Sequence, residues 1–152
     1  MEIKVQNKNK RYGELLKEAM CGKFSDLSCF LLYKYESYLF SQSDTYFSNN
    51  MSKFASDSLD HINIFGKVIT LLGVKPDFLN MELDEMFYLD NKEQLIEINI
   101  RLLKEKIIKY TKSLNEIEDD YIKEILSSFI IEERKNLEIL ELMQLKYKRE
   151  HF

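Results

Sequence analysis

Hydrophobic residues recur every three or four positions in four segments of the chain, a spacing typical of amphipathic α-helices. The pattern predicts helices over about residues 11–42, 50–73, 91–115 and 119–148. The hydrophobic stripe of the third segment, from Ile96 to Leu114, is apolar except for the hydroxyl of Tyr110. Helices with one apolar face bury that face against each other, so the pattern predicts an all-α four-helix bundle.

Residues at the expected helix ends agree with this division. Asp90 and Glu93 can form a reciprocal capping pair where the third helix begins, and Asp119 suits the first turn of the fourth. Gly73, followed by Pro76, supplies an end for the second helix. Local propensity and the hydrophobic period therefore indicate the same boundaries.

The connections between the helices predict how the bundle is wound. The first and last connections are short, so each joins two helices into an antiparallel hairpin. Residues 74–89 can span roughly 50 Å at 3.3 Å per residue, while the expected helices are roughly 35 Å long. This segment is therefore expected to cross over the length of the bundle between the two hairpins. It is too apolar for a free linker, so we expect it to pack on the bundle or against a second copy.

Composition limits the classes of function. The 152 residues include 1 Pro and 4 Gly, with 45% hydrophobic and 32% charged residues, as expected for one helical domain over residues 1–152. The formal net charge of -4 and the pI near 5.3 argue against nucleic acid as a partner. The sequence has neither the apolar stretch of a membrane span nor that of a secretory signal, so we expect a cytoplasmic protein with no membrane partner.

The two cysteines fit this compartment. Cys21 and Cys29 are expected about two turns apart on one helix, too far for a disulfide. We therefore expect reduced thiols that act as small apolar core residues.

Polar residues interrupt the hydrophobic stripes of three helices near mid-length. A buried carboxylate or imidazole costs several kcal/mol unless it is paired, hydrogen-bonded or bound to a metal ion. The interrupting residues are Asp26, Ser58, His61, Glu133 and Asn136. Ser58 and His61 are three residues apart, as are Glu133 and Asn136, so each pair lies on one helix face.

This pattern resembles the rubrerythrin-related, ferritin-like di-metal carboxylate proteins from about residue 15 to residue 143. Their helices carry E-x-x-A-x-x-x-Y, E-x-x-H before L-L-G, a Glu seven residues before a Tyr, and a second E-x-x-H. The corresponding positions here are Asp26 with Tyr33, Ser58 with His61 and then Leu71-Leu72-Gly73, Leu103 with Tyr110, and Glu133 with Asn136.

The resemblance implies a ferritin-like fold and a pair of iron or manganese ions, held by four carboxylates and two imidazoles and used with oxygen or peroxide. His61 and Glu133 keep the ligand type of the family, and Asp26 keeps a carboxylate on a shorter arm. The former ligand positions that carry a different chemistry are Ser58, Leu103 and Asn136. Hard cations need the missing charge, so two ions would have too few donors.

Two interpretations of the remaining polar residues stay open. They form a buried polar network, or Asp26, His61 and Glu133 hold one metal ion weakly. Asp57 and Glu132 lie off the stripes and are interpreted as surface charges.

We therefore expect no catalytic residues, no organic cofactor and no resident metal, although iron or manganese binding stays possible. The expected role is structural or protein-binding, as a homodimer or beside a related ferritin-like protein. This expectation draws on aromatic residues that lie off the stripes or in the crossover, namely Tyr35, Tyr38, Phe47, Phe87, Tyr88 and Tyr147. The alternative is an iron or manganese oxidoreductase acting on oxygen or peroxide with an unusual ligand set.

Overall fold

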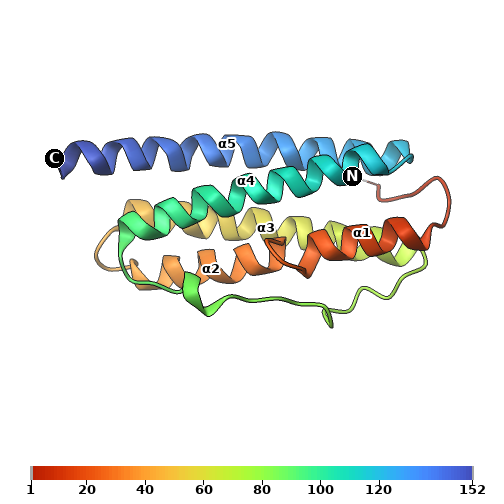
Figure 1. The fold of residues 1–152 in the computed structure, drawn as a ribbon, viewed down its shortest axis with the longest axis horizontal. Coiled ribbons are helices and arrows are strands. Elements are labelled where there is room, and N and C mark those ends of the chain that lie inside the picture. Colours follow the sequence, from red (N-terminus) through yellow and green to blue (C-terminus); the bar gives the residue numbers. More distant parts are fainter. Residues whose placement is uncertain (1, 152) are drawn as a thin grey trace.

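The computed structural model describes residues 2 to 151, and within that range the chain forms five α-helices and one short 3-10 helix (Figure 1). The helices are α1 (Lys10–Cys21), α2 (Asp26–Leu39), α3 (Thr45–Leu71), α4 (Lys92–Glu116) and α5 (Asp120–Glu150), and the 3-10 helix η1 spans Glu85–Phe87. The short α1 and α2 follow one another along one side of the bundle, beside α3, while α4 and α5 form the second hairpin (Figure 1). The described residues contain no β-strand, so the predicted all-α bundle of two hairpins is confirmed.

The single helix expected over residues 11–42 is wrong, because the chain leaves the helical conformation between Cys21 and Asp26. Phe24 has a φ of 54°, in the left-handed region that side chains disfavour, so no helix passes through it. Ser25 then starts α2 with a capping box: its hydroxyl accepts from the Ser28 N–H, and its own N–H donates to the Ser28 hydroxyl.

The break leaves the two cysteines on different helices, Cys21 at the end of α1 and Cys29 in α2, rather than on one helix as expected. Both are free and buried, as predicted.

The helix ends follow the expected chemistry with small shifts. Asp119 caps α5, and Gly73 lies just past the end of α3 with a φ of 92°. The cap of α4 is Asn91 instead of the expected Asp90, because the Asn91 side chain accepts from the N–H of Gln94.

The helix expected from residue 50 begins earlier in the structure. Asp44 caps α3 by accepting from the N–H of Phe47, so five residues, 45–49, join its first turns. Phe47 is buried by this extension, so it does not belong to an exposed aromatic cluster as expected.

The crossover runs along α1 and α2 from one end of the bundle to the other (Figure 1). Lys17 of α1 pairs with Asp77 at 2.7 Å, and the Cys21 thiol donates to Asn80 Oδ1 at 2.9 Å. The expectation that this segment packs on the bundle is therefore confirmed. No helix within residues 2–151 is both long enough and apolar enough to cross a membrane.

The core consists of two hydrophobic clusters, one toward each end of the bundle. One contains Leu16, Phe65 and Phe129, and the other contains Phe54 and Leu103. Buried polar side chains from α2, α3, α4 and α5 meet one another within this core. The two clusters exclude water from these polar groups and so raise the cost of leaving any of them unpaired.

Candidate functional site: a buried ion cluster

The ammonium group of Lys106 on α4 is fully buried in the bundle and contacts side chains of α2, α3 and α5. Its Nζ lies 2.9 Å from Asp26 Oδ1 on α2 and 3.1 Å from Glu133 Oε1 on α5. It also donates to Ser58 Oγ on α3 at 3.2 Å. Three acceptors match the three N–H bonds of an ammonium group, so this lysine is fully satisfied.

His61 on α3 extends the cluster toward solvent. Its Nδ1 lies 3.1 Å from Asp26 Oδ1, and its Nε2 lies 3.0 Å from Oε1 of Glu132, which is partly exposed. The imidazole stacks on Phe129, with 3.8 Å between the ring centroids. The hydroxyl of Tyr110 donates to Asp26 Oδ2, so both oxygens of that carboxylate have partners.

The electrostatics favour the charged forms of the lysine and the histidine. Burial alone would lower the pKa of His61, but Asp26 and the hydrogen bond to Glu132 outweigh burial and raise the pKa to about 9. Burial would also lower the pKa of Lys106, but Asp26 and Glu133 hold it well above its usual range. These shifts favour the charged form of both groups at neutral pH, and the carboxylate oxygens that face both nitrogens of His61 match a doubly protonated ring.

The two buried carboxylates respond differently. Burial would raise the pKa of Asp26, but Lys106 and His61 outweigh it, so the pKa lies below its usual range. The pKa of Glu133 is raised instead. Burial raises it, Lys106 opposes the rise, and the negative charge of Asp26 adds to it. Lys106 and His61 thus supply two positive charges opposite the carboxylates of Asp26 and Glu133.

The structure brings together most of the residues predicted for the site. One ligand atom each from Asp26, His61 and Glu133 falls within a group whose members all lie within 4.8 Å of one another. Ser58 joins them through Lys106. Leu103 is fully buried among apolar side chains, as an aliphatic residue should be.

The expectation that Asn136 joins the central network is wrong. Its Nδ2 donates to Asp57 Oδ2 at 3.1 Å, and its Oδ1 accepts from Lys53 Nζ at 3.2 Å. Lys53 and Asp57 also pair with each other, one helical turn apart on α3. Asp57 therefore belongs to a separate, outer polar group that draws the Asn136 amide away from the centre.

Glu132, interpreted from the sequence as a surface charge, contacts the cluster instead. It is partly exposed, yet its carboxylate accepts from His61. The reason is that His61 needs a second acceptor once Nδ1 is bound to Asp26, and Glu132 precedes Glu133 on the same turn of α5.

Lys106 is the residue of the cluster that the hydrophobic stripe of its helix did not reveal. The sequence does contain a signal, since the polar residues Asn99, Lys106 and Ser113 recur every seven residues, and the structure buries all three. This spacing keeps them on one helix face, beside the apolar stripe that includes Leu103 and Tyr110.

The donor atoms bear directly on the metal that the resemblance implies. In the structure, Asp26 Oδ1 and Glu133 Oε1 face the ammonium of Lys106, and both His61 nitrogens face acceptors. A protonated imidazole has no lone pair for a metal ion. As arranged, these residues do not fit a di-metal centre.

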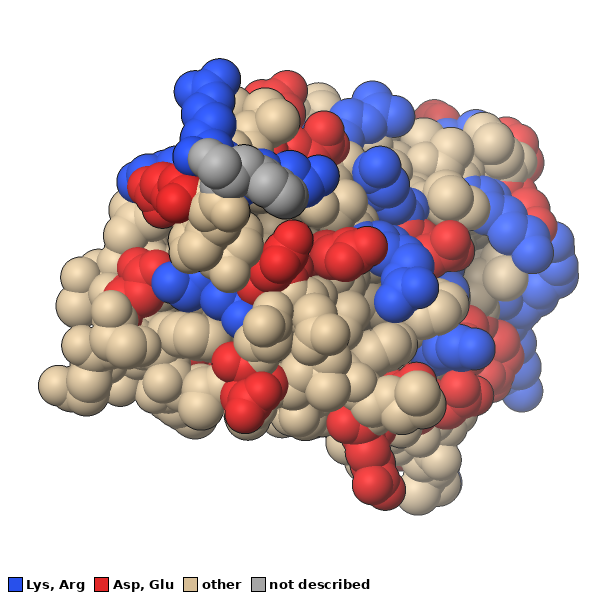
Figure 2. Space-filling model, turned by 60° about the vertical axis from the view of Figure 1, so that its left-hand side comes forward, with Lys and Arg blue, Asp and Glu red and all other residues tan. Residues whose placement is uncertain are grey.

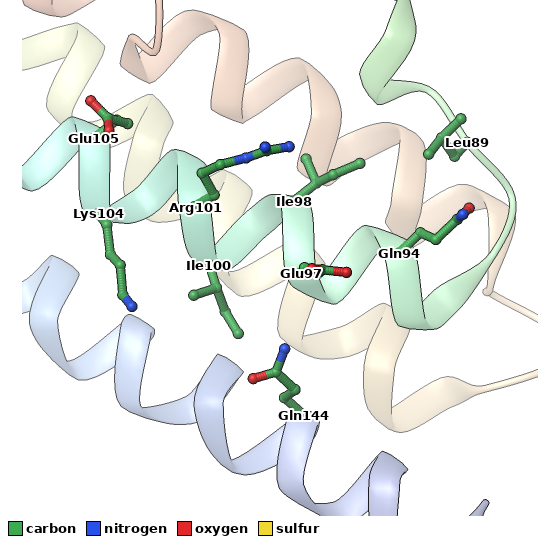
Figure 3. Close-up of a pocket in the computed structure, with 9 residues that line it drawn as sticks. All are labelled: Leu89, Gln94, Glu97, Ile98, Ile100, Arg101, Lys104, Glu105 and Gln144. Atoms are coloured by element: carbon green, nitrogen blue, oxygen red, sulfur yellow. The ribbon is translucent and has the colours of Figure 1, made fainter.

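An open pocket of about 530 Å³ between α4 and α5 is a poorer candidate (Figure 3). Its charged residues include Arg101, Lys104 and Glu105, which are exposed. In the close-up the Arg101 side chain extends toward Ile98 and the Lys104 side chain extends toward α5, so their charges do not converge on one point (Figure 3).

Comparison with solved structures identifies the architecture as the ferritin-like four-helix bundle, as the sequence motifs predicted. Two structures of KatB, a manganese catalase from Anabaena, superpose with TM-scores of 0.85 and 0.86 at 17% identity, over 97% of this chain and 77% of theirs. Bacterioferritin from Rhodobacter capsulatus, in a structure with a metal-free dinuclear site and heme iron, gives a TM-score of 0.78 at 18% identity. That match covers 95% of this chain and 89% of bacterioferritin.

No protein-family model matches the sequence, and no curated protein matches it. Because the identities to the solved structures are low, this similarity extends to the fold alone.

Proposed function

We propose that this chain is a ferritin-like protein in which an internal ammonium group has replaced the metal ions, and that its role is structural or protein-binding rather than catalytic. The observation that carries the proposal is the position of Lys106 Nζ, within 3.1 Å of an oxygen of both Asp26 and Glu133. The lysine performs the structural task of a cation, holding carboxylates of two hairpins together, without redox chemistry.

Charge balance supports this proposal. Two cations, Lys106 and His61, already neutralise two buried carboxylates, so adding a divalent ion would leave an excess of positive charge in a water-poor interior. Displacing Lys106 to make room is also costly, because its long side chain is buried over its full length.

The second candidate function is an iron or manganese oxidoreductase acting on oxygen or peroxide. The grouping of Asp26, His61 and Glu133 favours it, as does the shared fold with a manganese catalase. For this candidate, His61 would have to lose a proton and Lys106 would have to leave the two carboxylates.

Thermal unfolding with added metal separates the two candidates. We expect the melting temperature of the protein to stay unchanged when Mn²⁺ or Fe²⁺ is added anaerobically to the metal-free protein. An ion bound to the folded state at 100 times its Kd would stabilise it by about 2.7 kcal/mol, a shift of several degrees. Such a shift, abolished by His61→Ala, would support the oxidoreductase.

The surface proposed for protein binding is the outer side of the crossover. Its apolar side chains include Leu79, which is 90% exposed, and Met86, which is 77% exposed. Exposed apolar clusters of this kind mark interaction surfaces in soluble proteins. The crossover also covers α1 and α2 (Figure 1), and we propose that a second copy or a related ferritin-like protein packs on this side of the bundle in the cytoplasm.

The charged residues give no support for a nucleic-acid partner. On the face shown in Figure 2, Lys and Arg side chains are interspersed with Asp and Glu instead of forming one basic patch.

Gel filtration tests the proposed surface. The wild-type protein should elute as a dimer, and Leu79→Glu should shift it toward the monomer, because a charge would be buried at the interface. Leu142→Glu, on the 66% exposed Leu142 of α5, is the matched control and should leave the elution volume unchanged. A wild-type protein at the monomer mass would contradict the homodimer.

A further inference from the structure

A second buried polar pair, Glu36 and Asn99, joins the two hairpins apart from the Lys106 cluster. Glu36 lies on α2, Asn99 lies on α4, and both are fully buried. Asn99 Nδ2 donates to Glu36 Oε1 at 2.6 Å and lies 3.6 Å from the sulfur of Met51 on α3. This hydrogen bond connects the first hairpin to the second.

The remaining polar atom of each side chain has no hydrogen-bond partner in the part of the chain that the structure describes. Glu36 Oε2 and Asn99 Oδ1 are both buried and both unpaired within the described residues. Buried unpaired acceptors are rare in folded proteins, and each one requires an explanation. One added proton would satisfy both atoms. If Glu36 carried a proton on Oε2, that O–H could donate to Asn99 Oδ1.

The surroundings of Glu36 offer no other compensation for a negative charge. Burial raises the pKa of Glu36 to about 8, the Asn99 hydrogen bond opposes this rise, and no charged group affects it. The titratable groups that sense Glu36 are Cys29 and Tyr33 on α2 and Tyr88 after η1. All three are neutral at pH 7, because the ordinary pKa of a thiol or a phenol is already higher than 7 and burial raises the pKa of each further. The hydrophobic cluster beside the pair receives apolar side chains from α3, α4 and α5, among them Met51, Phe54, Ile96, Leu103, Leu140 and Met143.

We propose that Glu36 is a neutral carboxylic acid whose proton closes a two-bond latch with Asn99 between α2 and α4. Loss of this proton would place an uncompensated carboxylate opposite the Asn99 carbonyl oxygen and open the latch. The packing of the two hairpins is therefore linked to pH through a group outside the Lys106 cluster.

Glu36→Gln tests the latch, because its amide N–H can replace the proposed O–H. The pKa of Glu36 in the folded protein, about 8, lies above its ordinary value of 4.5. The stability that this proton contributes is therefore complete below pH 4.5 and is lost as the pH rises from 4.5 through 8. Urea unfolding of wild type and variant from pH 5 to 9 measures this loss. We expect the wild-type unfolding constant, divided by that of Glu36→Gln, to rise about tenfold per pH unit and level off near pH 8.

The ratio of the two constants cancels the titration of His61 and other groups common to both proteins. A ratio independent of pH would overturn the proposal. The unfolding constant of the wild type divided by that of Glu36→Met should depend on pH in the same way, because the readout is the slope and not the absolute stability. The test therefore does not depend on the folding of a single variant. Glu97→Gln, at an exposed position of α4, is the control and should give a flat ratio.

A bound cation is the competing way to neutralise Glu36. Adding Ca²⁺ or Mn²⁺ should leave the wild-type melting temperature unchanged relative to Glu36→Gln. Stabilisation of the wild type alone would show that a metal ion, and not a proton, compensates the carboxylate, and would overturn the latch.

Discussion

Lys106→Ala is expected to destabilise the protein more than any other single substitution considered. It removes the shared partner of Asp26 and Glu133, which lies 2.9 and 3.1 Å from their oxygens, and leaves two buried carboxylates facing each other. Removing one member of a buried ion pair costs about 3–5 kcal/mol, and the cavity left by the lysine stem adds to this loss. Urea unfolding at pH 7 measures the effect.

Two further variants separate the charge of Lys106 from its volume. Lys106→Met keeps most of the stem, and adding Glu133→Gln removes one of the repelling carboxylates, so the double variant should recover part of the lost stability. Lys104→Ala removes an exposed lysine two residues away and should change stability by no more than about 0.5 kcal/mol. A similar small effect of Lys106→Ala would show that the ammonium is not holding the carboxylates together.

Leu103→Glu is expected to have the second largest effect. This change restores the residue type that the family resemblance implies at this position, but the site is fully buried and Lys106 already has three acceptors. An added carboxylate would be desolvated without a partner of its own, so we expect a loss of a few kcal/mol in the free energy of unfolding. Thermal or urea unfolding of the metal-free protein measures it.

Leu103→Met is the matched control, because it keeps the apolar character and nearly the volume and should cost less than about 1.5 kcal/mol. If Leu103→Glu were as mild as this control, the centre of the bundle would have to be open and hydrated. That outcome would conflict with an interior filled by the ion cluster.

The sequence predicted the bundle and the crossover because both depend on the hydrophobic period, which is a property of long segments. It did not predict the break between Cys21 and Asp26. The hydrophobic period continues across the break and does not reveal it, and only the local chemistry of Phe24 and Ser25 interrupts the helix. The free-energy difference between such a capped break and one continuous helix is small. The hydrophobic period of 3.6 residues contains no information about it.

The candidate site was predicted in part for a related reason. Asp26, His61 and Glu133 stood out because they interrupt apolar stripes, and the structure brings them together. Lys106 did not stand out, because a lysine within a charged helix is ordinarily solvated and its long stem conceals which way the ammonium points. Its burial is set by carboxylates on two other helices, which are distant in the sequence.

Asn136 shows the reverse case. Its spacing from Glu133 predicts a place in the centre, yet the outer pair of Lys53 and Asp57 provides better partners for an amide than the ion cluster does. A short side chain at the edge of the core can turn either way, and the choice depends on groups contributed by another helix.

The metal content of protein purified without chelator is the most direct test of the central claim, that an ammonium group occupies the role of a metal ion in this bundle. Elemental analysis should find iron and manganese far below one ion per chain, with no difference between wild type and His61→Ala. Near-stoichiometric iron or manganese in the wild type, lost in His61→Ala, would contradict the account.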